Sequence, residues 1–293
     1  MQTLREVIKK ARRDKMAIGH FNVSNLEGFW GVFRAARDFN DSEKTPIIIG
    51  VSEGERDFLG VGQIAAIVAS VRQEYDYPIY LSADHTSSFD RAKEAIGAGF
   101  DLIVYDRSEL PLEENISETK QCVEYARKIN LEILVEGELG YIGKSSKLLD
   151  ELPVGAALTE EAITKPADAK KLVEETGVDL FAPAVGNIHG MLKHSPNPRL
   201  FIKRVAEIAE ATDCPLVLHG GSGLPDEDFA AAISAGVAIV HINTELRIAY
   251  RQALRETLQE NPEEIAPYKY LKSVVGAVKA ATEKRLAVFQ NQQ

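Results

Sequence analysis

The chain has 293 residues, a formal net charge of −10 and 45% hydrophobic residues, which together predict a globular protein with a large core. The acidic balance argues against a nucleic-acid-binding surface. No apolar run reaches the roughly 18–20 residues that cross a bilayer, so we expect no membrane span. The two cysteines, Cys122 and Cys214, do not make a disulfide framework and favour a cytoplasmic protein.

Apolar segments with β-strand character alternate with segments of helical spacing along the whole chain. After an amphipathic helix in residues 1–10, strands are predicted at residues 16–23, 46–52, 79–83, 102–106, 131–135, 180–184, 216–218 and 237–242. Helices are predicted at residues 26–39, 64–75, 88–98, 112–129, 167–176, 199–211, 226–235 and 245–260, with a last helix at 270–289. The rhythm breaks at residues 140–168, which predict a long loop after the fifth strand.

Eight strand–helix units in one run favour a single α/β domain over residues 1–293, namely a (β/α)8 TIM barrel with an extra C-terminal helix. An open doubly wound sheet is the alternative that this alternation leaves. In a TIM barrel the active site lies at the C-terminal ends of the strands. The residues that end the predicted strands are therefore the first candidates for a functional site.

Acidic and imidazole side chains close four of the predicted strands. Asp84 and His85 end the third strand, Glu138 follows the fifth, His189 the sixth and His219 the seventh. Neutral imidazoles are good Zn²⁺ ligands, and three protein ligands with one open position make a catalytic zinc site. We therefore predict a metal site at the barrel mouth, with a carboxylate such as Glu138 as a further ligand. A single histidine at a strand end is more often a packing residue, so the prediction rests on the three together.

The glycine-rich segment Gly220–Gly223 follows the seventh strand directly. Its backbone N–H groups can approach an anion closely, and Ser222 adds a hydroxyl donor. Asn243 and Thr244, after the eighth strand, supply the other half of a phosphate site that barrels often place on these two loops. A flexible turn is the alternative interpretation of the glycines. Ser52, after the second strand, is a weaker candidate for a second phosphate.

Asp84 has two interpretations that its position does not separate. It orients a metal ligand through a hydrogen bond, or it exchanges a proton with the substrate. With a metal that polarises a carbonyl and a phosphate site beside it, the second interpretation suggests enediolate chemistry on a phosphorylated ketone. Proton transfer by Asp84 would then make or break a carbon–carbon bond.

Four motifs of this sequence match one known family, and they are Asp84-His85, Glu136–Gly140, Gly186–Gly190 and Leu218–Gly223. Over nearly its whole length the chain resembles the zinc-dependent class II ketose-bisphosphate aldolases, which cleave fructose or tagatose 1,6-bisphosphate. The resemblance implies a glycolytic aldehyde-lyase that forms dihydroxyacetone phosphate and glyceraldehyde 3-phosphate through a zinc-stabilised enediolate. It also implies a homodimer or homotetramer.

The resemblance assigns roles to individual residues. One Zn²⁺ ion per chain would be held by His85, His189 and His219 with Glu138 as the additional ligand, and Asp84 would exchange a proton with the C4 hydroxyl of the ketose. The other matched positions are Gly190, Gly220 and Ser222 for a monovalent cation such as Na⁺ or K⁺, Gly221, Ser222, Asn243 and Thr244 for the phosphate of dihydroxyacetone phosphate, and Asn22 and Ser52 for the substrate.

Three positions depart from the family pattern. Loop 141–147 lacks the glutamate that often handles the proton at the nucleophilic carbon, and Asp150 or Glu151 is the nearest replacement. His241 occupies the usual place of an asparagine, where we expect it to contact the substrate. Lys269 stands where an arginine is frequent, and we expect it to bind the distal phosphate.

These departures leave the substrate and the presence of turnover open. The substrate could be tagatose bisphosphate or another phosphorylated ketose, or the barrel could bind zinc and phosphate without turnover. An aldolase that uses a Schiff-base lysine is disfavoured, because the strand ends carry acids and imidazoles instead.

Overall fold

Eight parallel strands close into a barrel in the computed structural model, which describes residues 2–40, 44–143 and 146–291. Around the barrel the strands follow the order β1, β10, β9, β7, β5, β4, β3, β2. Their bounds are β1 Ile18–Asn22, β2 Ile47–Val51, β3 Ile79–Thr86, β4 Leu102–Tyr105, β5 Leu134–Leu139, β7 Leu180–Pro183, β9 Leu216–Leu218 and β10 Val237–Ile242. Because β1 pairs with both β2 and β10, the predicted TIM barrel is confirmed and the open sheet is excluded.

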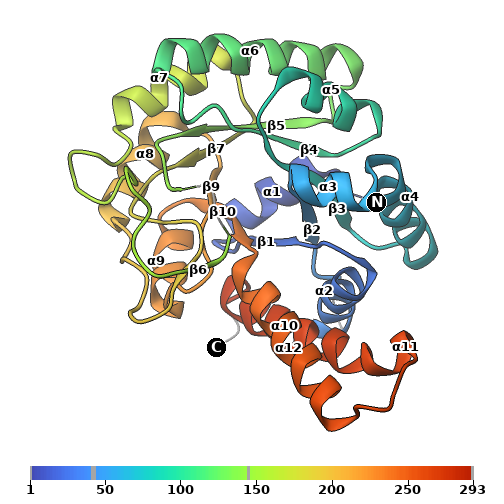
Figure 1. Ribbon diagram of the computed structural model, residues 1–293. Coiled ribbons are helices and arrows are strands. Elements are labelled where there is room, and N and C mark those ends of the chain that lie inside the picture. Colours follow the sequence, from blue (N-terminus) through green and yellow to red (C-terminus); the bar gives the residue numbers. More distant parts are fainter. Residues whose placement is uncertain (1, 41–43, 144–145, 292–293) are drawn as a thin grey trace.

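Helices surround the barrel, and α10, α11 and α12 extend from it as an arm (Figure 1). Local sequence explains the helix ends, since the Asn25 side chain accepts a hydrogen bond from the Gly28 N–H at 3.0 Å to cap α2. No helix of the described residues is long and apolar enough to cross a membrane. The helices are α1 Leu4–Arg13, α2 Leu26–Phe39, α3 Glu53–Leu59, α4 Val61–Tyr75, α5 Phe89–Gly97, α6 Leu112–Ile129, α7 Pro166–Thr176, α8 Ile202–Thr212, α9 Asp226–Ser234, α10 Thr244–Glu260, α11 Pro267–Tyr270 and α12 Lys272–Phe289.

Alternation along the strands separates two apolar clusters. Outward residues such as Phe21 pack against the helices, whereas inward residues such as Ile18 and Ile239 form a second cluster inside the barrel. Leu4 and Ile8 of α1 belong to this inner cluster, so α1 closes the N-terminal end of the barrel. Beyond the apolar layer, the same inward positions become polar toward the C-terminal ends of the strands. The fold therefore gathers these inward polar side chains at the mouth formed by the C-terminal ends of the strands.

The structure differs from the sequence predictions in several places. No helix is predicted between residues 52 and 64, yet α3 begins at Glu53, where the Ser52 N–H donates to Glu55 Oε2 at 2.8 Å. The predicted loop at 140–168 contains β6 (Leu148–Leu149), which pairs with β8 (Met191–Leu192); Lys144 and Ser145 of that loop lie outside the described residues. β5 begins at Leu134 rather than residue 131, which places Glu136 and Glu138 within the strand.

Candidate active site

Asp84 and His85 both face the barrel mouth although they are adjacent in β3. The pairing of β3 with β4 shifts register between Ala83 and Thr86, and His85 has a φ of 42°. A positive φ is uncommon outside glycine, and such strain is often found at functional sites. The local bulge thus cancels the alternation that would otherwise turn one of the two side chains outward.

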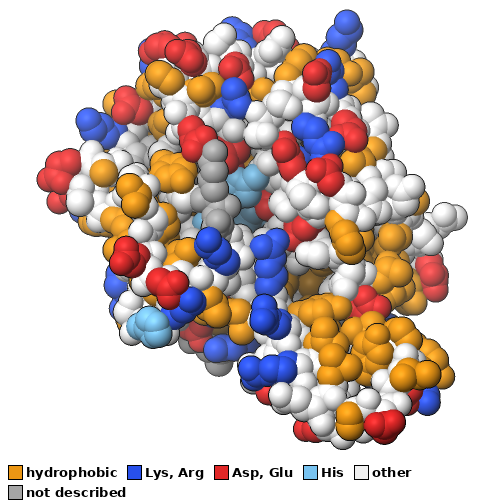
Figure 2. Space-filling view, viewed as in Figure 1, with side chains coloured by type: hydrophobic (Ala, Val, Ile, Leu, Met, Phe, Trp, Pro, Cys, Tyr) orange, Lys and Arg blue, Asp and Glu red, His pale blue; other side chains and the backbone are white. Residues whose placement is uncertain are grey.

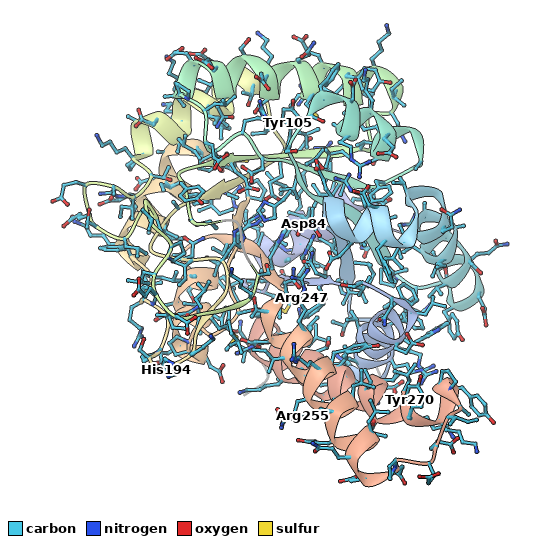
Figure 3. The ribbon with its side chains drawn as sticks, in the orientation of Figure 1. Asp84, Tyr105, His194, Arg247, Arg255 and Tyr270 are labelled. Carbon is cyan, nitrogen blue, oxygen red and sulfur yellow. The ribbon has the colours of Figure 1, made fainter. Side chains whose placement is uncertain are left out.

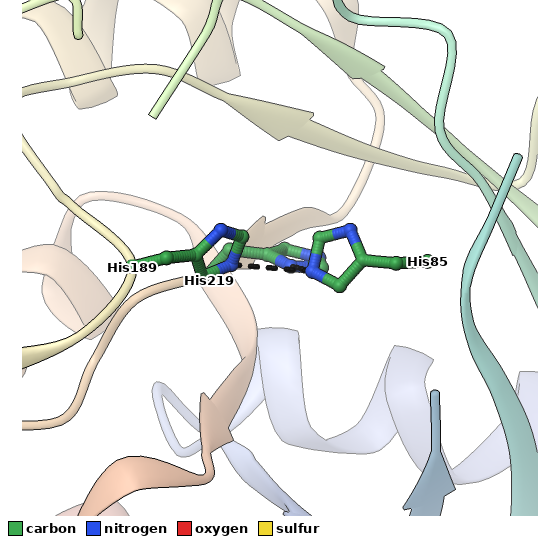
Figure 4. A group of neighbouring side chains, drawn as sticks. All are labelled: His85, His189 and His219. Atoms are coloured by element: carbon green, nitrogen blue, oxygen red, sulfur yellow. Dashed lines mark hydrogen bonds between the residues drawn. The ribbon is translucent and has the colours of Figure 1, made fainter. Parts of the chain in front are cut away.

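The structure brings His85, His189 and His219 together, as the sequence predicts (Figure 4). Nε2 of His85 lies 3.2 Å from Nε2 of His189 and 3.2 Å from Nδ1 of His219. Tetrahedral zinc with Zn–N bonds of about 2.0–2.1 Å places its nitrogen ligands about 3.3 Å apart. The three donors therefore fit one divalent ion. The prediction that His189 ends a strand is wrong, because β7 stops at Pro183 and His189 is delivered by the following loop.

The second ring nitrogen of each histidine meets an oxygen acceptor. These contacts are His85 Nδ1 to Asp106 Oδ2 at 3.0 Å, His189 Nδ1 to Gly143 O at 2.6 Å and His219 Nε2 to Glu136 Oε1 at 2.6 Å. Metal-binding histidines are typically held in this way, because the partner fixes both the tautomer and the ring orientation. The donor set and its supports thus both fit a metal site.

Glu138 approaches the cluster from another direction. Its Oε1 lies 3.1 Å from Nδ1 of His85, the nitrogen that does not face the other two histidines. Glu138 is buried, and with His85 and Asp106 it forms a second group of ligand-type atoms. In this conformation Glu138 supports His85 rather than joining the three converging nitrogens.

Protonation differs among the three imidazoles. Burial lowers the pKa of His189 to about 3 and also lowers the pKa of His219, so both rings are neutral and can ligate a metal. Burial acts in the same direction on His85, but the carboxylates of Glu138 and Asp84 outweigh it and raise its pKa well above the ordinary value. A metal ion would therefore displace a proton from His85.

Asp84 is a buried carboxylate with defined partners. Its Oδ2 accepts a hydrogen bond from Asn22 Nδ2 at 2.8 Å, and its Oδ1 lies 3.3 Å from Nδ1 of His241 and 3.9 Å from Nε2 of His85. Burial would raise the pKa of Asp84, but the charge on His85 and the contact with His241 outweigh it, so the pKa lies well below the ordinary value. An ionised acid thus stands beside the converging histidines.

Glu55 of α3 connects Asn22 and Ser52, the two residues that the sequence assigns to substrate binding. Its Oε2 accepts hydrogen bonds from Asn22 Nδ2 at 3.0 Å and from Ser52 Oγ at 2.9 Å, and its Oε1 lies 2.7 Å from Nη2 of Arg247. Glu55 is itself buried, and the same Nδ2 group of Asn22 also donates to Asp84. One carboxylate thereby fixes the amide that orients Asp84.

The glycine-rich loop and the start of α10, which the sequence assigns to one phosphate site, lie in contact. Ser222 Oγ accepts hydrogen bonds from the N–H groups of Asn243 and Glu245, both at 3.3 Å. Gly220 has a φ of 61°, and a Cβ there would lie 2.3 Å from the carbonyl oxygen of Ile188, so only glycine fits. A helix N-terminus is a common anion site, and here Ser222 already accepts from two N–H groups of that terminus.

Two adjoining pockets open at this mouth, where Figure 2 shows a hollow with histidine at its base and Lys and Arg side chains along its lower rim. Asp84, His85, Ser146, His189 and Asn243 line both pockets. The larger pocket, of about 350 Å³, is also lined by Ser52, Ser87, Asp106, Arg107, Glu109, Leu110, Gly143 and Arg247. The smaller one, of about 20 Å³, is also lined by Asn22, Gly190, His219, Gly220, Ser222, His241 and Thr244.

Some candidates do not reach these pockets. Lys269 lies on α11 in the arm and pairs with Glu264 at 2.9 Å, away from the mouth. Asp150 pairs with Lys193 at 2.8 Å and faces solvent, and Glu151 is also exposed. Arg247, by contrast, projects at the mouth near Asp84 (Figure 3), although no motif points to it.

Three buried site residues were not assigned a role from the sequence, namely His20, Glu55 and Glu136. The spacing of Ser52 and Glu55 is a capping box and could have identified α3 and its carboxylate. Glu136 lies two residues before Glu138 and therefore faces the same side of β5. His20 carries no such signal, because its importance depends on the β1–β10 pairing.

Comparisons with known proteins agree with this geometry. Residues 2–293 match the family model described as class-II fructose-bisphosphate aldolase. A probable fructose-bisphosphate aldolase of Bacillus subtilis is 37% identical over 290 residues, covering 98% of this chain and 96% of that protein. A fructose-bisphosphate aldolase of Staphylococcus aureus is 35% identical over 290 residues, with the same coverage of 98% and 96%.

A solved structure is similar in fold as well as in sequence. The crystal structure of the YdjI aldolase from Escherichia coli K12 superimposes with a TM-score of 0.81 at 31% identity, covering 98% of this chain and 96% of that chain. The match extends over the barrel and the arm alike, since almost the whole chain is covered. The family resemblance and the expectation of a class II aldolase are thereby confirmed, and the chain belongs to the class II fructose-bisphosphate aldolase family.

Proposed function

We propose that this protein catalyses the metal-dependent, reversible aldol cleavage of a ketose 1,6-bisphosphate to dihydroxyacetone phosphate and glyceraldehyde 3-phosphate. Fructose 1,6-bisphosphate is the first candidate substrate. The observation that carries the proposal is the convergence of three imidazoles, in which a nitrogen of His189 and a nitrogen of His219 each lie 3.2 Å from Nε2 of His85. An ionised aspartate and a glycine-rich anion loop stand beside them. The names of the relatives at 35% and 37% identity support the same reaction.

His85, His189 and His219 are the residues that would hold one Zn²⁺ ion, with Glu138 as an additional ligand. Bound there, the ion would supply a Lewis acid that polarises the substrate carbonyl. Asp106 is a second acceptor for Nδ1 of His85 at 3.0 Å, so that ring keeps a partner when Glu138 turns toward the ion. A thiolate-preferring site is not supported, because Cys122 and Cys214 are buried elsewhere as free thiols.

Asp84 acts as the base toward the C4 hydroxyl. Its carboxylate accepts the hydroxyl proton, the C3–C4 bond breaks, and the electron pair of that bond passes toward the C2 carbonyl oxygen as the aldehyde leaves. The enediolate that remains then takes up a proton at C3 and becomes dihydroxyacetone phosphate. The amide of Asn22 holds Asp84 at 2.8 Å, which keeps the carboxylate aimed before substrate arrives. In the synthetic direction Asp84 returns the proton to the new hydroxyl.

The two phosphates occupy opposite ends of the pockets. Gly221, Ser222, Asn243 and Thr244 bind the phosphate next to the ketone, and Gly190, Gly220 and Ser222 bind a monovalent cation beside it. His241 contacts the substrate in the smaller pocket, and Ser52 contacts it in the larger pocket. Arg107 and Arg247 line the larger pocket and are better placed than Lys269 for the distal phosphate.

A coupled cleavage assay tests this function. The purified protein should cleave fructose 1,6-bisphosphate, lose activity in excess chelator and regain it on addition of Zn²⁺, while borohydride with substrate has no effect. Inactivation by borohydride would indicate a lysine mechanism instead, although the described residues that line the two pockets include no lysine. Tagatose 1,6-bisphosphate, which differs only at C4, is assayed in parallel to define the substrate.

A non-catalytic barrel is the competing function. It predicts that the zinc-loaded protein binds dihydroxyacetone phosphate but does not exchange its C–H protons with solvent. Detectable exchange would exclude this alternative. We further propose a cytoplasmic enzyme with one catalytic domain per chain, assembled from two or four copies. Sedimentation measurements of the purified protein can test the number of copies.

A further inference from the structure

His20 lies in a closely fitted slot inside the barrel. It pairs in register with His241 across β1 and β10, and the two imidazole rings stack with centroids 3.5 Å apart and an angle of 5° between their planes. On the other side, Gly50 of β2 makes room for the ring, because a Cβ at Gly50 would lie 2.0 Å from Cε1 of His20. The slot therefore holds a flat five-membered ring closely between Gly50 and His241.

The ring of His20 has no role in hydrogen bonding among the described residues. It is fully buried, and neither of its nitrogens has a partner there. Burying a polar group without a partner destabilises a fold, so packing alone does not explain an imidazole at this position. Its close, nearly parallel contact with His241 is the interaction that remains.

His241 connects this slot to the reacting centre. Its Nδ1 lies 3.3 Å from Oδ1 of Asp84, and its other face meets His219 with ring centroids 3.9 Å apart. It also lines the smaller pocket between the converging histidines and the loop at Gly220. The plane of the His241 ring thus decides where a nitrogen points relative to Asp84 and to a bound substrate.

We propose that His20 is a positioning residue for the aldol reaction, which clamps the ring of His241 between itself and His219 and so fixes the contact between His241 and Asp84. This inference rests on the proposed aldolase function. The clamp acts on geometry, since His20 touches neither pocket. Small misplacements of a group near a reacting centre cost far more rate than binding.

The test compares three variants of the full-length, zinc-loaded protein. His20→Leu fills the slot without a flat ring, and Gly50→Ala pushes the imidazole out of place from the opposite side. Ile18→Ala is the matched control, because Ile18 faces the barrel interior from the same strand, one inward position below His20. Zinc content, melting temperature, kcat and KM are measured for each variant.

The clamp predicts that His20→Leu and Gly50→Ala lower kcat by on the order of 10²-fold with KM within about twofold and zinc still bound. Ile18→Ala should lower the melting temperature while its kcat stays within about twofold of the wild type. The inference is overturned if His20→Leu keeps wild-type kcat. It is equally overturned if Ile18→Ala loses as much kcat as His20→Leu, since the loss would then follow general packing.

A spectroscopic measurement separates this inference from the proposed function. In protein with labelled histidine, ring currents from the stack shift the ring protons of His241 upfield, and His20→Leu should abolish much of that shift and alter the Nδ1 resonance facing Asp84. An inactive wild-type enzyme would contradict the aldolase proposal but leave this readout available. Unchanged His241 resonances in His20→Leu would contradict the clamp whatever the activity.

Discussion

Removing the carboxylate of Glu136 should weaken metal binding without unfolding the protein. Glu136 Oε1 lies 2.6 Å from Nε2 of His219, and the two side chains are 0% and 1% exposed, so no water can replace the acceptor without rearrangement. That contact keeps Nδ1 of His219 directed at the converging site. In Glu136→Ala, the Nε2–H group of a metal-bound His219 would be buried without a partner.

Two independent estimates of the cost agree. An unsatisfied buried donor costs about 1–3 kcal/mol. Loss of a hydrogen bond that supports a metal-binding histidine typically weakens metal affinity about 10- to 100-fold, which corresponds to about 1.4–2.7 kcal/mol. Glu136→Gln should weaken affinity less than Glu136→Ala, because the amide oxygen can still accept the hydrogen bond from His219.

Competition with a chromophoric chelator measures the zinc affinity of each variant. Glu132→Ala is the control, because Glu132 is an exposed glutamate just before β5. The expected order of zinc affinity is wild type and Glu132→Ala, then Glu136→Gln, then Glu136→Ala. A folded Glu136→Ala protein whose zinc Kd lies within twofold of the wild type would refute the view that Glu136 orients a metal ligand.

Three further predictions follow from the charges and contacts of the site. Asp84→Asn should retain zinc but lose cleavage, as seen by comparing metal content with turnover, and full activity would reject the assigned role. The pKa of His85 is raised, so a metal ion must displace a proton from its ring. Zinc affinity should therefore fall roughly tenfold for each unit that the pH is lowered below that pKa, as zinc titrations at several pH values would show. A pH-independent zinc Kd would contradict this. Burial lowers the pKa of His20 from 6.5 to about 4, so the unfolded state takes up its proton first as the pH falls. The metal-free wild type should therefore lose about 3 kcal/mol relative to His20→Leu between pH 6.5 and pH 4, measured by urea unfolding, and equal losses would argue against a neutral buried ring.

The fold could be predicted because its signal is local and repeated. Each strand of the barrel is buried on both faces, so segments such as residues 46–52 appear as continuous apolar runs between helices of regular spacing. The short helix α3 was missed because seven residues carry too little periodicity, although Ser52 and Glu55 mark its start. The small β6–β8 pairing depends on contacts between distant loops, which no local pattern records.

The site was predictable in its residue types more than in its contacts. Ligand-type side chains at strand ends indicated the metal cluster, since a barrel brings those ends to one mouth. Sequence spacing could not show that Glu138 contacts Nδ1 of His85 rather than the converging nitrogens, nor that Lys269 lies in the arm. The stacking of His20 on His241 arises from strand register, which becomes visible only once the barrel is closed.

The central claim is that three imidazoles share one zinc ion, and X-ray absorption at the zinc edge of the zinc-loaded protein tests it most directly. We expect one zinc per chain, with three imidazole nitrogens at about 2.0–2.1 Å, a remaining oxygen ligand and no sulfur. The spectrum of His219→Ala should lose an imidazole contribution. A protein that takes up no zinc, or a zinc spectrum with fewer than two imidazoles, would contradict the account.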